Sequence, residues 1–223
     1  FSTGEPPDFK GEHYQFTLCN PFFNPGPIEG INTVPIHIAA VNEYNCSLAG
    51  ELGDGIRMHP LNSPSYIRDV IRPAVADGAS RAGRDISDIE FAINPFFITG
   101  RTEEEFEESR RLIRKHLSFY AATRTYSTVL KHHGLEEVGD ELVKLSRANR
   151  WNDMPALISD DMLETFAIVG YHEELPEKLK ARYSGLVDTV NVVFGPPYAE
   201  LQERQRRQFA DLGSVLPSLQ RVT

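Results

Sequence analysis

Residues 34–60 read VPIHIAAVNEYNCSLAGELGDGIRMHP, and this stretch decides the fold class of the chain. An apolar run rich in β-branched residues, 35–41, is followed by a break at Asn42 and Glu43 and then by apolar residues at helical spacing. After a Gly-Asp-Gly turn, a second apolar run begins. Strand, helix and strand in so short a stretch form a βαβ unit, whose two strands pair in parallel. Parallel sheets bind ligands at the carboxyl ends of their strands, so we expect a functional site there.

Apolar runs and helical patterns alternate along the rest of the chain. Ser63 and Pro64 form an N-cap and an N1 proline, and Pro73 predicts a kink in the helix that they begin. A capping box at 102–105 predicts a second, long helix, and Pro95 predicts a bulge or an early stop in the strand that contains it. We therefore predict four strands, near residues 35–41, 55–60, 89–98 and 186–194.

At 223 residues the chain can bury one good core, as one large domain or two small ones, and we expect a single domain over residues 1–223. Its first 33 residues are rich in Pro and Gly and predict an extended arm or a hairpin. Residues 124–170 predict a helical insert before the last strand, with helices near 127–131, 135–148 and 160–168. After the last strand, an amphipathic tail helix is expected.

Composition narrows the class of protein. The chain is 40% hydrophobic and 25% charged, as in an ordinary soluble globular protein. A net charge of -9 and a pI near 5.3 argue against nucleic acid or an anionic membrane as a partner. The two cysteines lie in different contexts and no signal-peptide pattern is present, so we expect reduced thiols and a cytoplasmic location. The fingerprints of nicotinamide Rossmann, nucleotide-triphosphatase and serine-hydrolase proteins are missing from the sequence.

Four parallel strands can form an open sheet or half of an eight-stranded barrel. A half barrel leaves two strand edges unpaired and one side of its core uncovered, which is unfavourable in water. Such a chain would need the other half, a second copy or a rearrangement. We therefore expect association into a homo-oligomer.

Several motifs together resemble one family, the luciferase-like flavin or deazaflavin oxidoreductases. The LAGE-x-x-DG core within residues 34–60 resembles the fifth and sixth strands of that family. Further matches are GEHYQF, PAVADGASRAGRD and FAIVGYHEELPEKLKARYSGLVDTVNV, and HLSFYAATRTYSTVLKHHGL resembles the branch that uses coenzyme F420. The resemblance implies an α/β fold of the (β/α)8 TIM-barrel type, with only the last four β/α units present in this partial barrel.

The same resemblance implies an activity. It predicts part of an oxidoreductase or monooxygenase that acts on a small organic substrate with coenzyme F420, or alternatively FMN, as cofactor. The coenzyme would supply the hydride or oxygen chemistry, and the protein would position it. The isolated chain is expected to be inactive, because the first four strands carry most of the catalytic side chains in that family. The alternative is a non-catalytic partial-barrel module that associates with itself.

The turn after the first strand is the candidate cofactor site. A helix N-terminus favours an anion, and the resemblance implies that this turn helps to hold the coenzyme phosphate. It assigns that role to Val41, Asn42 and Tyr44, with Ala40 as a backbone wall. The alternative is an ordinary capped helix, which Glu43 favours because it adds negative charge.

Histidines and one arginine supply the remaining candidates. His59, at the carboxyl end of the second strand, is the candidate catalytic residue. It could hydrogen-bond a flavin edge or donate a proton near neutral pH. The alternative is an ordinary surface histidine. Arg57 lies in the same strand and alternates to the same face as His59. If that face lines a barrel, Arg57 would meet a ligand phosphate or an acidic partner. Otherwise the side chain of Arg57 points outward. His132 and His133 lack ligand spacing, so we expect no metal and expect both to face solvent. His37 is expected to be a satisfied buried histidine.

Overall fold

The computed structural model describes residues 5–24, 26, 27, 29, 30, 34–192, 210 and 213. The chain divides into two units, residues 1–36 and 37–223. In the first unit, strands β1 (Phe9–Lys10) and β2 (Gln15–Phe16) pair antiparallel, and a 3-10 helix, η1 (Pro21–Phe23), follows. A short hairpin therefore lies within the segment for which a hairpin or an arm was expected.

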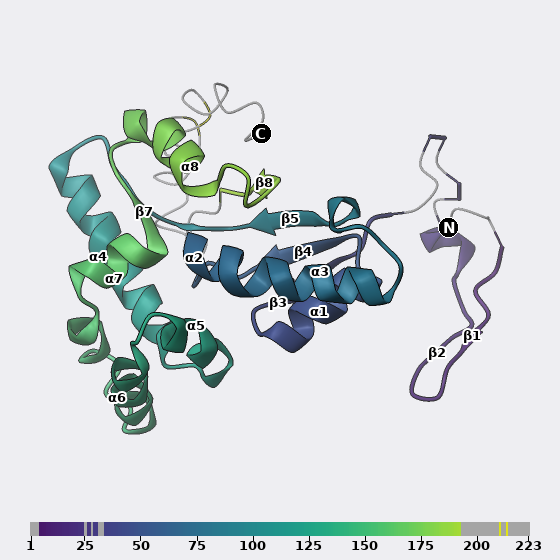
Figure 1. Ribbon diagram of the computed structural model, residues 1–223, viewed down its shortest axis with the longest axis horizontal. Helices are drawn as coiled ribbons and strands as arrows, with labels where there is room; N and C mark the ends of the chain where they lie inside the picture. The colour runs from purple at the N-terminus through teal and green to yellow at the C-terminus, as the bar shows by residue number, and fades with distance from the viewer. Residues whose placement is uncertain are drawn as a thin grey trace. The chain divides into compact units, whose positions relative to one another are not determined.

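The second unit contains a parallel sheet of four strands (Figure 1). Its order is β3-β4-β5-β8, and each neighbouring pair is parallel. The strands are β3 (His37–Ala40), β4 (Gly55–Met58), β5 (Glu90–Ile93) and β8 (Thr189–Val190). These strands lie within the four predicted runs and confirm the parallel α/β class, whereas closure into part of a barrel stays a prediction.

Two further strands, β6 (Phe96–Ile98) and β7 (Ala167–Val169), form a separate parallel pair. β6 is the second half of the predicted strand 89–98, which is interrupted between Ile93 and Phe96. This is the early stop expected from Pro95, because proline has no N–H for the sheet. β7 corrects the prediction of a helix over residues 160–168. The helix ends at Phe166, and the next three residues pair with β6.

Helices connect and cover the strands. The α-helices are α1 (Glu43–Leu52), α2 (Pro64–Tyr66), α3 (Arg72–Arg81), α4 (Glu103–Ala121), α5 (Ser127–His132), α6 (Glu136–Arg147), α7 (Asp160–Phe166) and α8 (Leu175–Tyr183). Shorter helical turns are the π-helix η2 (Ile67–Ile71) and the 3-10 helices η3 (Ile86–Asp88), η4 (Arg124–Tyr126), η5 (Met154–Leu157) and η6 (His172–Glu174). The predicted tail helix lies mostly outside the described residues.

Local sequence explains where these helices begin. The side chains of Asn42, Ser63 and Thr102 accept hydrogen bonds from backbone N–H groups three residues on, as N-caps do. The capping box at Thr102 is incomplete, because Glu105 accepts from the N–H of Arg101 instead. Before Pro73, where a kink is predicted, the chain forms the π-helical turn η2. A wider turn suits a position where proline donates no hydrogen bond.

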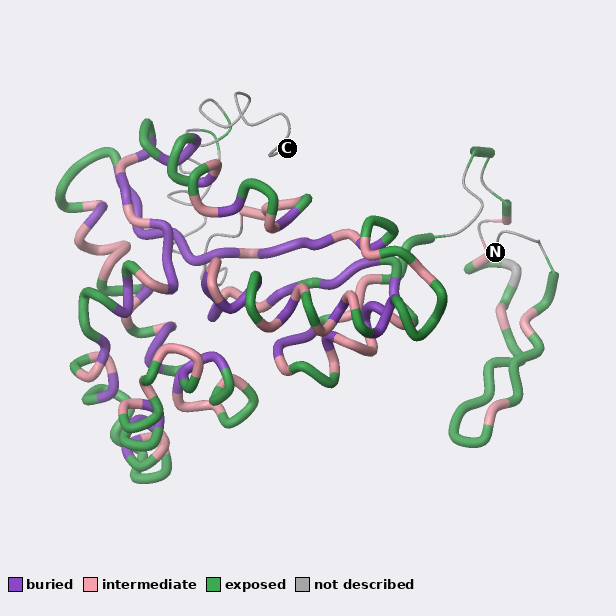
Figure 2. The backbone as a smooth tube through the Cα atoms, in the orientation of Figure 1, coloured by how far each residue is buried: buried purple, intermediate pink, exposed green. Residues whose placement is uncertain are grey.

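Helices α1 and α3 pack against each other at two glycines. A Cβ on Gly50 would lie 2.0 Å from the carbonyl oxygen of Val75, and a Cβ on Gly78 would lie 1.8 Å from that of Ser47. Only glycine permits so close an approach of the two backbones. The pair lies along one face of the sheet, in which β4 and β5 are largely buried while β3 and β8 are mostly half-buried (Figures 1 and 2).

Burial alternates over the last three residues of β4 and shows which face the helices cover. Ile56 and Met58 are buried, while Arg57 between them is exposed. Ala39, which pairs with Arg57, is exposed as well. The face that carries these two residues is therefore open to solvent at β3 and β4. Among the described residues, no helix is long and apolar enough to cross a membrane.

Candidate functional site

The turn after β3 combines buried and exposed residues. Ala40 and Val41 belong to the hydrophobic core, whereas Tyr44 is 78% exposed. Asn42 has an extended backbone, and its Oδ1 accepts the N–H of Asn45 at 2.9 Å. This cap uses one N–H at the start of α1, and other first-turn N–H groups of a helix have no partner within the helix. The turn thus offers an apolar wall and backbone donors side by side, with the charge of Glu43 in the first turn opposing an anion.

A buried tyrosine ties this turn to a distant helix. The hydroxyl of Tyr66 lies 3.1 Å from the carbonyl oxygen of Val41 and 3.0 Å from Oγ1 of Thr128 in α5. A carbonyl only accepts and a phenol has one hydrogen, so Tyr66 donates to Val41 and Thr128 donates to Tyr66. Burial raises the pKa of Tyr66, which keeps the phenol protonated.

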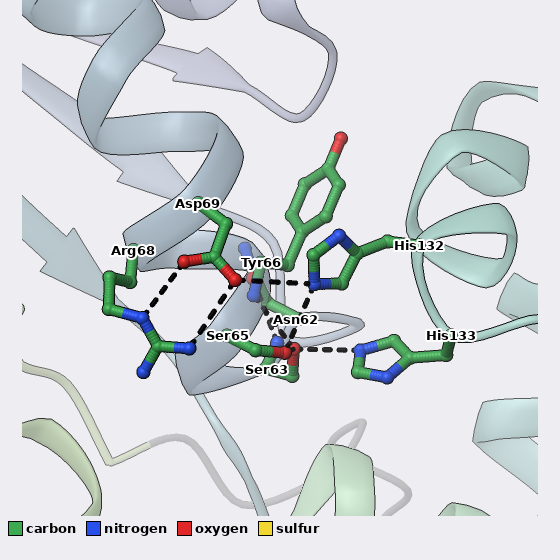
Figure 3. A network of polar contacts seen from close by, with 8 residues as sticks. All are labelled: Asn62, Ser63, Ser65, Tyr66, Arg68, Asp69, His132 and His133. Carbon is green, nitrogen blue, oxygen red and sulfur yellow. Dashed lines mark hydrogen bonds and ion pairs between the residues drawn. The ribbon is translucent and has the colours of Figure 1, made fainter.

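The residues around Tyr66 extend these contacts into a polar network (Figure 3). Nε2 of His133 lies 2.8 Å from Oγ of Ser63, and Nε2 of His132 lies 3.2 Å from Oγ of Ser65. The same Nε2 of His132 lies 3.9 Å from a carboxylate oxygen of Asp69. The prediction that both histidines face solvent is therefore wrong: each is partly buried and contacts a serine of the β4–α2 segment. The arrangement is no catalytic triad, because Ser65 and Asp69 meet the same nitrogen of His132.

Asn62, next to this network, has an unused donor. The residue is 1% exposed, and its Oδ1 accepts the N–H of Ser63 at 2.8 Å. Its Nδ2 is buried and has no hydrogen-bond partner in the described part of the chain. A buried amide donor without an acceptor is unfavourable, so this position suits a bound acceptor group or a water.

His59 lies between two tyrosine rings. Its ring is stacked on Tyr126 at a centroid distance of 4.2 Å and meets Tyr120 edge-on at 4.5 Å. Nδ1 accepts the N–H of Leu61 at 3.0 Å, so a neutral ring carries its hydrogen on Nε2. Burial lowers the pKa of His59 to about 4, which leaves it uncharged near neutral pH. His59 is therefore half-buried between two rings and is no plain surface histidine, whereas its two predicted roles toward a ligand stay predictions.

Arg57 points outward, which is one of the two positions expected for it, whereas the expectation for His37 needs correction. Arg57 points away from the helix-covered face and has no ion pair with any residue that the structure describes. Nε2 of His37 lies 3.5 Å from a carboxylate oxygen of Glu90, but Nδ1 is buried without a partner. His37 is therefore only partly buried and incompletely satisfied, which corrects the sequence expectation. Gly55 makes room for it, since a Cβ there would lie 2.7 Å from His37 Nε2.

Metal and thiol chemistry find no support in the described residues. No group of three or more His, Cys, Asp or Glu side chains among them could hold a metal ion. Cys19 and Cys46 are both free, and burial raises the pKa of Cys46 to about 12. Its thiol is thus protonated and a poor nucleophile.

Sequence reasoning missed Tyr66, Tyr120, Tyr126 and Thr128. Tyr66 falls in the helix that Ser63 and Pro64 are predicted to begin, and no local pattern there marks it as a link to another segment. A buried tyrosine hydroxyl needs a hydrogen-bond partner, and that rule could have marked the residue as a link to another segment.

Comparison with known proteins identifies the family. Residues 1–189 match the luciferase-like monooxygenase family, and the chain belongs to that family. An uncharacterized protein of Mycobacterium tuberculosis is 36% identical over 186 residues, which cover 83% of this chain and 54% of that protein. An F420-dependent glucose-6-phosphate dehydrogenase of Nakamurella multipartita is 26% identical over 71% of this chain and 43% of its own length.

A solved structure shows the same fold. The coenzyme F420-dependent tetrahydromethanopterin reductase of Methanopyrus kandleri superposes with a TM-score of 0.68 and 21% identity, over 86% of this chain and 53% of that one. The chain thus spans about half the length of the relatives that it matches.

Proposed function

We propose that this chain is the carboxyl-terminal part of an oxidoreductase that uses coenzyme F420, or alternatively FMN, to transfer hydride to or from a small organic substrate. Membership of the luciferase-like family supports the class of enzyme, and the F420-dependent relatives support the coenzyme. The observation that carries the proposal is the parallel β3–α1–β4 unit. It places the start of α1 at the carboxyl end of β3, where parallel sheets bind ligands.

The residues at this turn fit the phosphate of such a coenzyme. Ala40 and Val41 supply an apolar wall, and the N–H groups of Asn42 and Tyr44 supply donors for an anion. The unused Nδ2 of Asn62 is a further donor at the end of the neighbouring strand. Arg57, on the open face of the sheet, would add positive charge to the same site. When bound, the coenzyme ring would supply the hydride chemistry.

His59 would act as a hydrogen-bond donor in this enzyme. Its neutral ring presents Nε2–H, while Nδ1 is held by Leu61. Stacking on Tyr126 fixes the plane of the ring. We therefore assign to His59 the orientation of an oxygen atom of substrate or coenzyme, in place of proton transfer.

The alternative, a non-catalytic module that associates with itself, rests on a different observation. Among the described strands, β3 pairs only with β4, and Ala39 and Arg57 are exposed on the sheet. An open strand edge is a template for pairing with another chain. Under this proposal a second copy would cover the edge, which also agrees with a homo-oligomer.

Titration of the chain with coenzyme F420 and with FMN, followed by coenzyme fluorescence, tests the proposal. Asn42→Asp keeps a good N-cap but adds a negative charge at the turn, so binding should weaken about fivefold, or about 1 kcal/mol. Asn152→Asp adds the same charge at an exposed remote position and should leave affinity unchanged. Equal affinities of Asn42→Asp and the wild type would refute the assignment of the turn. If neither coenzyme binds and the chain sediments as an oligomer, the self-associating module is the better interpretation.

A further inference from the structure

Three side-chain pairs join α5 and its C-cap residue, His133, to the segment that follows β4. Ser63, Ser65 and Tyr66 lie on one side of this contact, which we call the α5 clasp. Their partners are His133, His132 and Thr128, in that order (Figure 3, which omits Thr128). All three pairs bridge more than sixty residues of sequence, as their separations of 70, 67 and 62 show.

Helix α5 depends on such contacts for its position. It has six residues, far fewer than the roughly 12–15 that an isolated helix needs in water. Val129 and Leu130 anchor it in the core, and a Cβ on Gly139 of α6 would lie 2.7 Å from Cδ1 of Leu130. These apolar contacts hold one side of the helix, and the clasp fixes the side that carries Thr128 and His132.

One member of the clasp also reaches the turn after β3. Tyr66 donates to the carbonyl oxygen of Val41, while its own oxygen accepts from Thr128. The Val41–Asn42 peptide is trans, so its N–H points opposite to its C=O. When Tyr66 holds the carbonyl on its own side, the N–H of Asn42 must point away from Tyr66. The orientation of this peptide thus depends on a hydroxyl that Thr128 orients from α5.

We propose that Tyr66 is a positioning residue that couples helix α5 to the turn after β3. Through Thr128 and Tyr66, a displacement of α5 changes the orientation of the Val41–Asn42 peptide, and a ligand at the turn stabilises α5 in return. The coupling itself rests on the contacts of the chain alone. Its consequence for coenzyme affinity rests on the proposed function.

Amide hydrogen exchange of the coenzyme-free chain tests the coupling directly. Tyr66→Phe removes only the hydroxyl and should raise exchange in two peptides, residues 41–46 and 127–133. Tyr183→Phe is the matched control, because Tyr183 and Tyr66 are both 1% exposed and Tyr183 lies in α8. It should leave exchange in both peptides unchanged.

Thr128→Val separates coupling from a merely structural role of Tyr66. This substitution lies in α5, yet it should raise exchange in residues 41–46, because Tyr66 loses the donor that orients its proton. The same change at the exposed Thr125, Thr125→Val, should not. With Tyr66→Phe already present, Thr128→Val should have little further effect on the turn, since both act through one hydroxyl. Exchange that rises only in residues 127–133, or additive effects at the turn, would overturn the coupling.

Coenzyme titration then tests the consequence separately. Tyr66→Phe and Thr128→Val should each weaken binding of coenzyme F420, by about fivefold for Tyr66→Phe. If the wild type binds no coenzyme, the proposed function fails while the exchange result still stands. If the wild type binds and both variants bind equally well, the turn does not depend on Tyr66, and the inference fails although the proposed function holds.

Discussion

The neutral His59 should make the stability of this protein depend on pH. Burial lowers its folded-state pKa to about 4 from an ordinary value of 6.5. The unfolded chain therefore binds more protons than the folded chain between these two values. The sign follows from linkage: this contribution is fully present above about pH 6.5 and is lost as the pH falls toward 4.

The size of the effect follows from the shift. Each pKa unit corresponds to about 1.4 kcal/mol, so lowering the pH from about 7 to about 5 would cost about 2 kcal/mol if the full shift applied. Because His59 is only partly buried, we expect solvent to halve this to about 1 kcal/mol. Asp69, Asp85 and Asp160 have pKa values lowered from 3.8, so they titrate below this pH window.

Urea unfolding of the wild type and of His59→Asn at the two pH values measures this term. Asparagine can still accept the N–H of Leu61 but does not titrate. Burial also lowers the pKa values of His116 and His133, but both histidines are present in the wild type and in the variant. Their contributions therefore cancel when the stability losses of the two proteins are subtracted. The wild type should lose about 1 kcal/mol more than the variant between pH 7 and 5. Equal losses would show that His59 is charged or solvated in the folded protein, and would remove the argument against proton donation.

Three further predictions concern the helices and the sheet edge. Gly78→Ala forces a Cβ against the carbonyl group of Ser47 and should lower the free energy of unfolding by about 2–4 kcal/mol, measured by urea unfolding. A loss below about 1 kcal/mol would mean that α1 and α3 separate easily. Asn42→Ala removes the cap of α1 and should cost about 1 kcal/mol in the same assay, whereas unchanged stability would show that the cap is replaced by water. Ala39→Lys places a charge on the edge strand β3 and should reduce self-association, measured by sedimentation. An unaltered oligomer would mean that the copies contact each other at another surface.

The parts of this fold that depend on local sequence could be predicted. The apolar runs, the Gly-Asp-Gly turn and the caps at Asn42 and Ser63 determine the β3–α1–β4 unit and the start of α2 within a few residues of each feature. β7 could not be predicted in this way. Its three apolar residues directly follow a helix, and only pairing with β6, far away in the sequence, makes them a strand.

The candidate site shows the same limit. The position of His59 follows from the end of β4, but its lowered pKa requires rings that arrive from α4 and η4. His132 and His133 were expected to face solvent because neighbouring helical residues diverge by about 100° and no ligand spacing surrounds them. Their serine partners lie about seventy residues upstream, so no local pattern reveals them.

The open face of the sheet links the family to the physical chemistry of this chain. Parallel sheets are normally covered on both faces, yet α1 and α3 lie on one face while Ala39 and Arg57 are exposed on the other. An arginine at the centre of a strand suits a face that meets water or an anionic ligand, and would be unfavourable against an apolar layer without a partner. The relatives are nearly twice as long as the segment that they share with this chain. We therefore infer that further strands, from the rest of a longer protein or from a second copy, would complete the surface around Arg57 and close the site that β3 and β4 begin.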